Sequence, residues 1–229
     1  NINDKCGSTY MENISDFVKK NNCDLGVAFD GDADRCLAVD ENGELVDGDK
    51  LIAIFAKAMK EEGTLKNDTA VVTVMTNIGF MKFAKENGIS VETTKVGDRY
   101  VLERMKEKGF NIGGEQSGHI IFLENATTGD GQLSAAKLLS FYKKADKKMS
   151  ELASVMTYYP QILVNVKIKP EWKNKLDTVK EITDCIAKNA EKLGDDGRIL
   201  VRESGTEPLI RVMVEGKEQS EINRVAEEI

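Results

Sequence analysis

The sequence has few residues of the kinds that build disulfide scaffolds or zinc sites. Its 229 residues include four cysteines and a single histidine, and no pair of cysteines has C-x-x-C spacing. In a chain of this size, scattered cysteines indicate reduced thiols in the cytoplasm rather than a disulfide framework. We therefore expect free and mostly buried thiols at Cys6, Cys23, Cys36 and Cys185.

Basic residues are too few and too dispersed to indicate a nucleic-acid partner. The formal net charge is −7, and no dense run of Lys or Arg could follow a phosphate backbone. No apolar run approaches the ~20 residues of a membrane span, and the first residues lack a signal-peptide pattern. We expect neither a nucleic-acid partner nor a membrane partner. The 31% charged and 41% hydrophobic residues instead indicate an ordinary soluble globular protein.

One acidic stretch carries the strongest functional signal. The segment D-G-D-A-D-R, residues 30–35, lies between two short apolar runs that we predict to be strands. Small residues separate its three aspartates, so the backbone can fold tightly around one point. Three like charges this close are tolerable around a cation, and oxygen ligands without Cys or His favour Mg²⁺. We predict a Mg²⁺ site formed by Asp30, Asp32 and Asp34.

Three other interpretations of this stretch fit its residues less well. A solvated acidic turn is common, but such turns seldom alternate three aspartates with Gly and Ala. An EF-hand loop needs glycine at its sixth position, where this chain has Arg35, and its next positions here form a strand. A phosphatase of the D-x-D type would use the first aspartate as nucleophile, with further acidic residues downstream. The metal site remains the favoured interpretation.

A glycine-rich segment, G-G-E-Q-S-G-H at residues 113–119, lies between two predicted short strands. Glycines let a backbone approach a ligand closely. Glu115 can accept hydrogen bonds from two adjacent hydroxyls, and Ser117 can donate or accept, as a sugar requires. His119, the single histidine, is suited to proton transfer near neutral pH. A glycine-rich hairpin with a packed histidine explains the same residues equally well, and both interpretations stay open.

A second polar turn, residues 202–211, joins two predicted strands. Hydroxyls, a glycine and an arginine at each end are typical of a phosphate-binding loop, because the arginine fork grips phosphate with two hydrogen bonds. A structural turn whose arginines pair with Glu203 and Glu207 is the alternative. The candidate phosphate-binding residues are Arg202, Ser204, Gly205, Thr206 and Arg211.

A third segment, K-V-G-D-R-Y at residues 95–100, follows a predicted strand and precedes a predicted helix. Ligands bind at such strand ends in α/β sheets, and a helix N-terminus favours anions. Gly97, Asp98 and Arg99 are therefore candidate substrate-binding residues. Taken alone, Asp98 is better explained as the helix N-cap.

The order of the predicted strands and helices divides the chain into three parts. Residues 1–47 contain a predicted helix at 8–22, with Ser8 as its N-cap, and the metal loop. Residues 48–156 alternate strands and helices, as an α/β domain with a largely parallel sheet does. Residues 157–229, after a predicted hinge at Pro160, have the predicted order β-α-β-β-α, with the first of these helices at 173–193. The chain starts at Asn1 and stops at Ile229 inside a predicted helix, and we therefore expect it to be a piece of a longer protein.

Taken in order, these loops resemble the α-D-phosphohexomutase superfamily over the whole chain. D-G-D-A-D-R is similar to its metal loop, G-E-Q-S-G-H to its sugar loop and R-E-S-G-T-E-P-L-I-R to its phosphate loop. The residues of these motifs are most similar to those of the bacterial branch that acts on glucosamine phosphates. Ala33 departs from the glycine usual in the family, and its methyl group narrows the freedom of the loop. The resemblance implies the end of a second domain, a three-layer α/β third domain and an α+β, TATA-binding-protein-like fourth domain.

The resemblance also implies a function. The full enzyme would be an isomerase of amino-sugar metabolism that interconverts glucosamine 6-phosphate and glucosamine 1-phosphate through a bisphosphorylated intermediate. Mg²⁺ would be its cofactor, and Arg35 and His119 its candidate catalytic residues. The family's serine loop, T-A-S-H-N-P or close to it, does not occur here. The 229 residues would then need the missing N-terminal domains of the same protein as partners. Glucose or mannose phosphate mutases and a non-catalytic sugar-phosphate-binding module remain alternatives.

Overall fold

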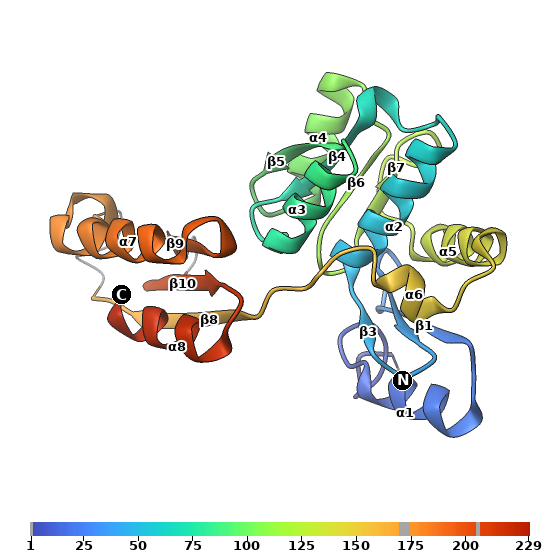
Figure 1. Cartoon of the computed structure of the whole chain (residues 1–229), viewed down its shortest axis with the longest axis horizontal. Helices are drawn as coiled ribbons and strands as arrows, with labels where there is room; N and C mark the ends of the chain where they lie inside the picture. The colour runs from blue at the N-terminus through green and yellow to red at the C-terminus, as the bar shows by residue number, and fades with distance from the viewer. Residues whose placement is uncertain (1, 170–174, 205–206) are drawn as a thin grey trace. The chain divides into compact units, whose positions relative to one another are not determined.

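The computed structural model describes residues 2–169, 175–204 and 207–229 (Figure 1). The chain divides into two compact units, Asn1–Thr157 and Tyr158–Ile229. The start that we predicted for the helix at 173–193, and the candidate phosphate ligands Gly205 and Thr206, lie outside the described residues.

The first unit begins with helix α1 (Glu12–Asn21) and a small antiparallel sheet, in the order β1-β2-β3. Its strands are β1 (Leu25–Phe29), β2 (Cys36–Asp40) and β3 (Leu45–Val46). The tight turn between β2 and β3 confirms the predicted Asn-Gly hairpin, with Gly43 at a φ of 77°.

The predicted N-cap of the first helix is wrong. The helix begins at Glu12, and its N-cap residue Met11 makes no side-chain capping bond. Ser8 is buried instead, and its backbone N–H donates to the carbonyl of Phe29 at 2.9 Å. The segment before the helix therefore runs beside the end of β1 and is not the helix's first turn.

A second, four-stranded sheet lies in the same unit, in the order β5-β4-β6-β7. Its strands are β4 (Thr69–Thr73), β5 (Ser90–Thr94), β6 (Ile112–Gly114) and β7 (Ile120–Phe122). β4 pairs in parallel with β5 and β6, while β7 runs antiparallel to β6. The helices are α2 (Gly48–Glu61), α3 (Ile78–Glu86), α4 (Asp98–Lys108), α5 (Gly131–Ala145) and α6 (Met149–Ala153), the last of which we did not predict.

Helices cover both faces of this sheet, as expected for a three-layer α/β domain. On one face, Val71 and Ile121 pack with Val101 and Met105 of α4. On the other face, Ala70 and Val72 of β4, Ile112 of β6 and Phe122 of β7 join the core formed by α2, α3 and α5. Alternate residues of β4 point to opposite faces, so every residue of this strand is buried.

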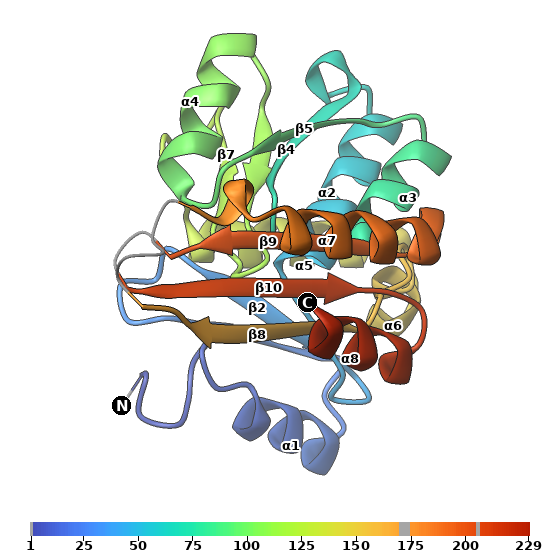
Figure 2. The ribbon, with the colours of Figure 1, turned by 90° about the vertical axis from the view of Figure 1, so that its left-hand side faces the viewer.

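The second unit is a three-stranded antiparallel sheet in the order β8-β10-β9, with β10 in the middle (Figure 2). Its elements are β8 (Gln161–Lys167), α7 (Lys180–Leu193), β9 (Arg198–Glu203), β10 (Leu209–Glu215) and α8 (Gln219–Glu228). This confirms the β-α-β-β-α order and its antiparallel central pair. Both helices pack on one face of the sheet, because Leu193 and Ile222 share a core cluster with Val212 and Val214.

The cysteines are free, as expected, but they are less buried than we predicted. Cys36 alone is buried, whereas Cys6, Cys23 and Cys185 are partly exposed. Burial raises the pKa of the Cys36 thiol to about 12. Within the described ranges, no helix is both long enough and apolar enough to cross a bilayer.

Candidate functional site

Three of the predicted loops follow strands of the first unit at their carboxyl ends. The metal loop follows β1, the segment at residues 95–97 follows β5, and the sugar loop, residues 115–118, follows β6. Since β5 and β6 both run parallel to β4, the last two loops emerge at the same edge of the sheet. The edge formed by the ends of parallel strands is where ligands bind in α/β sheets.

The metal loop brings its three carboxylates to one point. One oxygen each from Asp30, Asp32 and Asp34 lies within 4.8 Å of the others. The turn that achieves this places Ala33 at a φ of 59°, a left-handed conformation that an alanine rarely adopts. The carbonyl of Ala33 accepts a hydrogen bond from the N–H of Gly131 at 2.9 Å, which fixes the loop to the start of α5.

The electrostatics of this cluster fit a hard divalent cation. Burial raises the pKa of Asp34, and the neighbouring charge of Asp30 raises it further, while His119 opposes the shift. The Oδ1 atom of Asp34 is buried without a hydrogen-bond partner in the described part of the chain. A cation would relieve the repulsion and supply that partner, and an oxygen-only ligand set suits Mg²⁺.

Arg35 connects the metal loop to the sugar loop. Its backbone N–H donates to Oδ1 of Asp30 at 3.2 Å, and its guanidinium Nε lies 3.6 Å from Oδ2 of the same residue. Arg35 also forms an isolated antiparallel β-bridge with His119. The next residue, Cys36, donates its N–H to the carbonyl of Gly118 at 3.0 Å. The two loops are thus joined by backbone pairing.

His119 lies at the meeting point of the three loops and is only 3% exposed. Its Nε2 accepts a hydrogen bond from the N–H of Gly129 at 3.2 Å, which places the proton of a neutral ring on Nδ1. The same Nε2 lies 3.4 Å from Oδ2 of Asp34 and 3.9 Å from Oδ2 of Asp98. If Nε2 carried a hydrogen, it could no longer accept from Gly129 and would instead face these carboxylates as a donor.

The sugar loop and the segment after β5 also meet directly. Oε1 of Glu115 accepts a hydrogen bond from the N–H of Gly97 at 2.9 Å. The Oγ of Ser117 is buried and has no hydrogen-bond partner among the described residues. Of the two polar groups that we predicted to bind a sugar, one therefore bonds the segment after β5 and the other is unsatisfied in the described part of the chain.

The prediction that Asp98 caps α4 is wrong. Gly97 is the N-cap residue, with a φ of 128° that favours glycine, and Asp98 is the first residue of the helix. The carboxylate of Asp98 faces His119 instead. Arg99 is not brought to the cluster: its side chain is 80% exposed and pairs with Glu103 at 2.7 Å, which raises the pKa of Arg99.

The phosphate loop lies in the second unit, at the β9–β10 turn. Arg202 and Arg211 stand directly opposite each other in the strand register. The N–H of Ser204 donates to the carbonyl of Leu209 at 2.8 Å, and the Ser204 Oγ accepts from the N–H of Glu207 at 3.3 Å. The described part of this turn is therefore held by its own hydrogen bonds.

A structural turn would pair these arginines with Glu203 and Glu207, and one such approach, between Arg211 and Glu207, is present. The guanidinium of Arg211 lies 3.9 Å from the carboxylate of Glu207, near the limit for an ion pair, and its Nε has no hydrogen-bond partner in the described part of the chain. Glu203 accepts from the N–H of Leu176 at 3.2 Å. Arg211 thus keeps a donor for an anion.

Two groups of residues that contact the cluster were missed in the sequence. Gly129 binds His119, and Asp47 and Gly48 contact the sugar loop from the start of α2. The only sequence signal was D-G-D at residues 47–49, which we interpreted as the beginning of a new domain.

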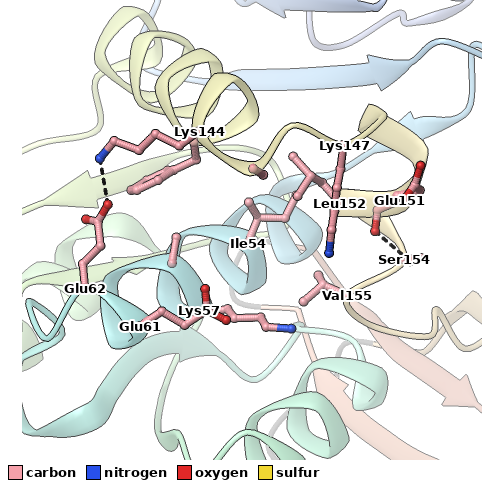
Figure 3. Close-up of a pocket in the computed structure, with 13 residues that line it drawn as sticks. Ile54, Lys57, Glu61, Glu62, Lys144, Lys147, Glu151, Leu152, Ser154 and Val155 are labelled. Atoms are coloured by element: carbon pink, nitrogen blue, oxygen red, sulfur yellow. Dashed lines mark hydrogen bonds and ion pairs between the residues drawn. The ribbon is translucent and has the colours of Figure 1, made fainter.

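The candidate site does not coincide with the cavity between α2, α5 and α6. A cavity of about 660 Å³ lies between α2, α5 and α6, lined by residues such as Ile54, Phe141 and Val155 (Figure 3). None of the predicted site residues that the structure describes lines it. The candidate site is therefore defined by its side chains and contacts.

Comparison with protein families gives matches along most of the chain. Three models of phosphoglucomutase/phosphomannomutase match it: the alpha/beta/alpha domain II at residues 4–43, the alpha/beta/alpha domain III at 47–159 and the C-terminal domain at 163–229. The metal, sugar and phosphate loops fall in these three matches respectively.

Curated relatives cover the whole chain. A phosphoglucosamine mutase of Thermoanaerobacter sp. (strain X514) is 54% identical over 228 residues, which are 100% of this chain and 51% of the relative. The phosphoglucosamine mutase of Caldanaerobacter subterraneus subsp. tengcongensis is 55% identical over 228 residues. The chain spans about half the length of the curated relatives that it matches.

Solved structures support the same fold. Aspergillus fumigatus N-acetylphosphoglucosamine mutase in complex with GlcNAc-6P and magnesium is 21% identical, with a TM-score of 0.77 over 98% of this chain and 56% of that one. An N-acetylglucosamine-phosphate mutase of the alpha-D-phosphohexomutase superfamily, in a product complex, is 24% identical, with a TM-score of 0.76 over 98% of this chain and 52% of that one.

Proposed function

The chain belongs to the phosphoglucomutase/phosphomannomutase family, and from this premise we propose that it forms part of a phosphoglucosamine mutase. Such an enzyme interconverts glucosamine 6-phosphate and glucosamine 1-phosphate through a bisphosphorylated intermediate. The proposed domain bounds are 1–47, 48–156 and 157–229. The identity to phosphoglucosamine mutases over the whole chain supports this substrate over glucose or mannose phosphates.

One observation carries the proposal. The carboxylates of the metal loop, the single histidine and the sugar loop form one cluster, linked by the contacts of His119 with Asp34 and of Glu115 with Gly97. Phosphoryl transfer to a sugar needs a cation site beside groups that hold hydroxyls. A solvated acidic turn or an unrelated glycine-rich hairpin would not bring these residues together.

Asp30, Asp32 and Asp34 are the proposed ligands of Mg²⁺. The chemistry that the bound ion supplies is neutralisation of charge on the transferring phosphoryl group. Arg35, held against Asp30, adds positive charge beside the same group. His119 is the proposed acid/base residue, acting through Nε2, the ring atom that faces Asp34 and Asp98.

The remaining residues bind and orient the substrate. Glu115 and Ser117 accept from and donate to sugar hydroxyls, assisted by the segment at Gly97 and Asp98. Arg99 is a further proposed substrate-binding residue, which would have to leave its pair with Glu103 to reach the sugar phosphate. The phosphate that does not react is held by Arg202, Ser204, Gly205, Thr206 and Arg211, which position the one that does.

A coupled assay tests the proposal. Glucosamine 1-phosphate formation from glucosamine 6-phosphate is measured in the complete mutase, meaning the protein that carries this chain together with a phosphoserine loop. We expect turnover that requires Mg²⁺ and prefers glucosamine over glucose and mannose phosphates. A preference for glucose or mannose phosphate would assign the alternative mutase, and the absence of turnover with all three sugars would contradict the function.

The 229 residues by themselves are proposed to bind Mg²⁺ and to catalyse no turnover, because the family's serine motif does not occur in them. Measurable turnover by the isolated chain would contradict this. A cytoplasmic location is proposed as well, since the four free cysteines suit a reducing compartment.

A further inference from the structure

We propose that Asp47 and Gly48, at the start of α2, form a seat that positions the sugar loop for hexose recognition. The inference rests on the proposed function, because it assigns these two residues a part in binding the sugar of that reaction. Both act through the loop, and they are therefore positioning residues.

Gly48 makes the closest approach to the loop. Its backbone N–H donates to the carbonyl of Gln116 at 3.0 Å. A Cβ built on Gly48 would lie 2.1 Å from the carbonyl oxygen of Glu115, 2.7 Å from that of Gln116 and 2.7 Å from the nitrogen of Gly118. All three are backbone atoms that no rotamer change can move away. Glycine is needed here to leave room for the loop.

Asp47 holds the same turn through its side chain. Its Oδ1 accepts from the N–H of Lys50 at 3.0 Å and so caps α2. Its Oδ2 accepts from Nε2 of Gln116 at 3.4 Å, which is a long hydrogen bond. Asp47 is 7% exposed, and this burial raises its pKa despite the hydrogen bonds that it accepts. One carboxylate thus fixes the helix start and the loop together.

The contacts of the seat position the two residues that are proposed to bind the sugar. Glu115 and Ser117 lie on either side of Gln116, the residue that both seat contacts reach. The carboxylate of Glu115 extends from the seated turn to the N–H of Gly97 at 2.9 Å. Displacing the turn therefore displaces the polar groups proposed to bind the sugar. The nearest atoms to Gly48 include none from the metal loop, so a shifted turn reaches that loop only indirectly, through the backbone pairing of Gly118 with Cys36.

The test is Gly48→Ala in the complete mutase. We expect the KM for glucosamine 6-phosphate to rise about tenfold or more, since displacement of a positioning group by an ångström costs up to about a hundredfold. We expect kcat and the Mg²⁺ requirement to change far less. Alanine is the better helix former, so weakening of α2 cannot explain the effect.

Gly63→Ala is the matched control, because a Cβ there meets nothing within 4 Å while its φ of 70° makes the substitution strained. It is expected to lower stability and leave KM unchanged. Asp47→Ser is the second variant, in case Gly48→Ala does not fold. Serine keeps the helix cap but loses the oxygen that reaches Gln116, and KM should rise about threefold.

Hydrogen exchange separates this inference from the proposed function. In the 229-residue chain, Gly48→Ala should speed exchange of the amides at 115–118 far more than exchange of those at 30–35. Unchanged exchange at 115–118 in the folded variant, or a wild-type KM in an active mutase, would overturn the seat. Faster exchange at 115–118 together with a wild-type protein inactive on all three sugars would refute the function while leaving the seat in the fold.

Discussion

The two units differ in how their candidate residues are brought together. In the first unit, Asp34, Asp98 and His119 come from three loops far apart in sequence and meet through side-chain contacts. In the second unit, Arg202 and Arg211 belong to one hairpin and face each other through strand register alone. Tertiary packing builds the first site, whereas local backbone pairing builds the second.

The two sites also differ in charge and therefore in the step that each can assist. The first gathers carboxylates around His119 and suits a cation close to the reacting phosphoryl group. The second presents arginines and suits an anion that stays in place. Substitutions of the carboxylates in the first unit should act mainly on kcat, and substitutions of the arginines in the second mainly on KM.

The largest effect is expected for Asp32→Asn in the metal loop. Asp32 is exposed, so the fold should be kept while one ligand loses its charge. We expect kcat to fall about 10²–10³-fold, as when one electrostatic group of an active site is removed. Mg²⁺ affinity should fall as well, as measured by calorimetry. Asp16→Asn, on the exposed face of α1, is the control; equal loss in both variants would contradict the metal site.

Arg211→Lys tests whether the second unit acts on substrate binding rather than on the chemical step. Lysine keeps the charge and loses the two-pronged grip on phosphate, so KM should rise about tenfold with kcat changed much less. The measurement is steady-state kinetics at two salt concentrations. Arg224→Lys on α8, where the arginine only approaches Glu221 at 3.9 Å, should leave KM unchanged. A fall in kcat alone would place the second unit in the chemical step.

Ser117→Ala sharpens the assignment within the first unit. Its Oγ has no hydrogen-bond partner in the described part of the chain, so its removal should leave thermal stability nearly unchanged. The loss of one hydrogen bond to the sugar should raise KM about three- to tenfold. A stability loss with an unchanged KM would mean that the hydroxyl is structural.

Ser150→Ala tests a contact outside both sites. Ser150 donates to Glu41 through its N–H at 3.0 Å and its Oγ at 2.5 Å, which ties α6 to the β2–β3 turn. Losing the Oγ bond should lower the free energy of unfolding by about 1 kcal/mol, with kinetic constants unchanged. A changed KM would show that this contact reaches the site.

The same contact gives a pH dependence. Burial alone would raise the pKa of Glu41, but the hydrogen bonds from Ser150 outweigh it and lower the pKa below its usual 4.5. The stabilisation is therefore present above pH 4.5 and is lost as the pH falls through the folded-state pKa. The stability difference between wild type and Ser150→Ala should shrink over that range in urea titrations, and a constant difference would contradict it.

The smallest effect is expected for Ala33→Gly. An alanine in the left-handed region costs roughly 1–2 kcal/mol, whereas glycine loses roughly 0.5–1 kcal/mol more backbone entropy on folding. The substitution should therefore raise the free energy of unfolding by about 0.5 kcal/mol, as measured by urea denaturation. A clear loss of stability would mean that the methyl group packs in the loop.

The sequence predicted those features whose cause is local. Alternating aspartates, the Asn-Gly turn and the β-branched run of β4 each determine their own neighbourhood, and the structure agrees with them. The order of the last five elements also followed from local periodicity. By contrast, we assigned Ser8 and Asp98 as helix caps from their residue types, and both assignments are wrong. The backbone N–H of Ser8 donates to the carbonyl of Phe29, and Gly97 is the N-cap residue of α4.

Contacts between loops could not be predicted from one sequence. Nothing in the local pattern shows that the N–H of Gly129 would donate to His119, or that the N–H of Gly48 would donate to the carbonyl of Gln116. These contacts depend on where strand ends and helix starts are placed by the core. The chemistry of the site was therefore predictable residue by residue, and its assembly was not.

The most direct measurement is an anomalous-scattering map from crystals of the complete mutase soaked in Mn²⁺ with glucosamine 6-phosphate. The account predicts one strong peak about 2 Å from oxygens of Asp30, Asp32 and Asp34, which is lost in Asp32→Asn. A peak held by other residues, or none at these carboxylates in crystals where the sugar phosphate is bound, would contradict the account.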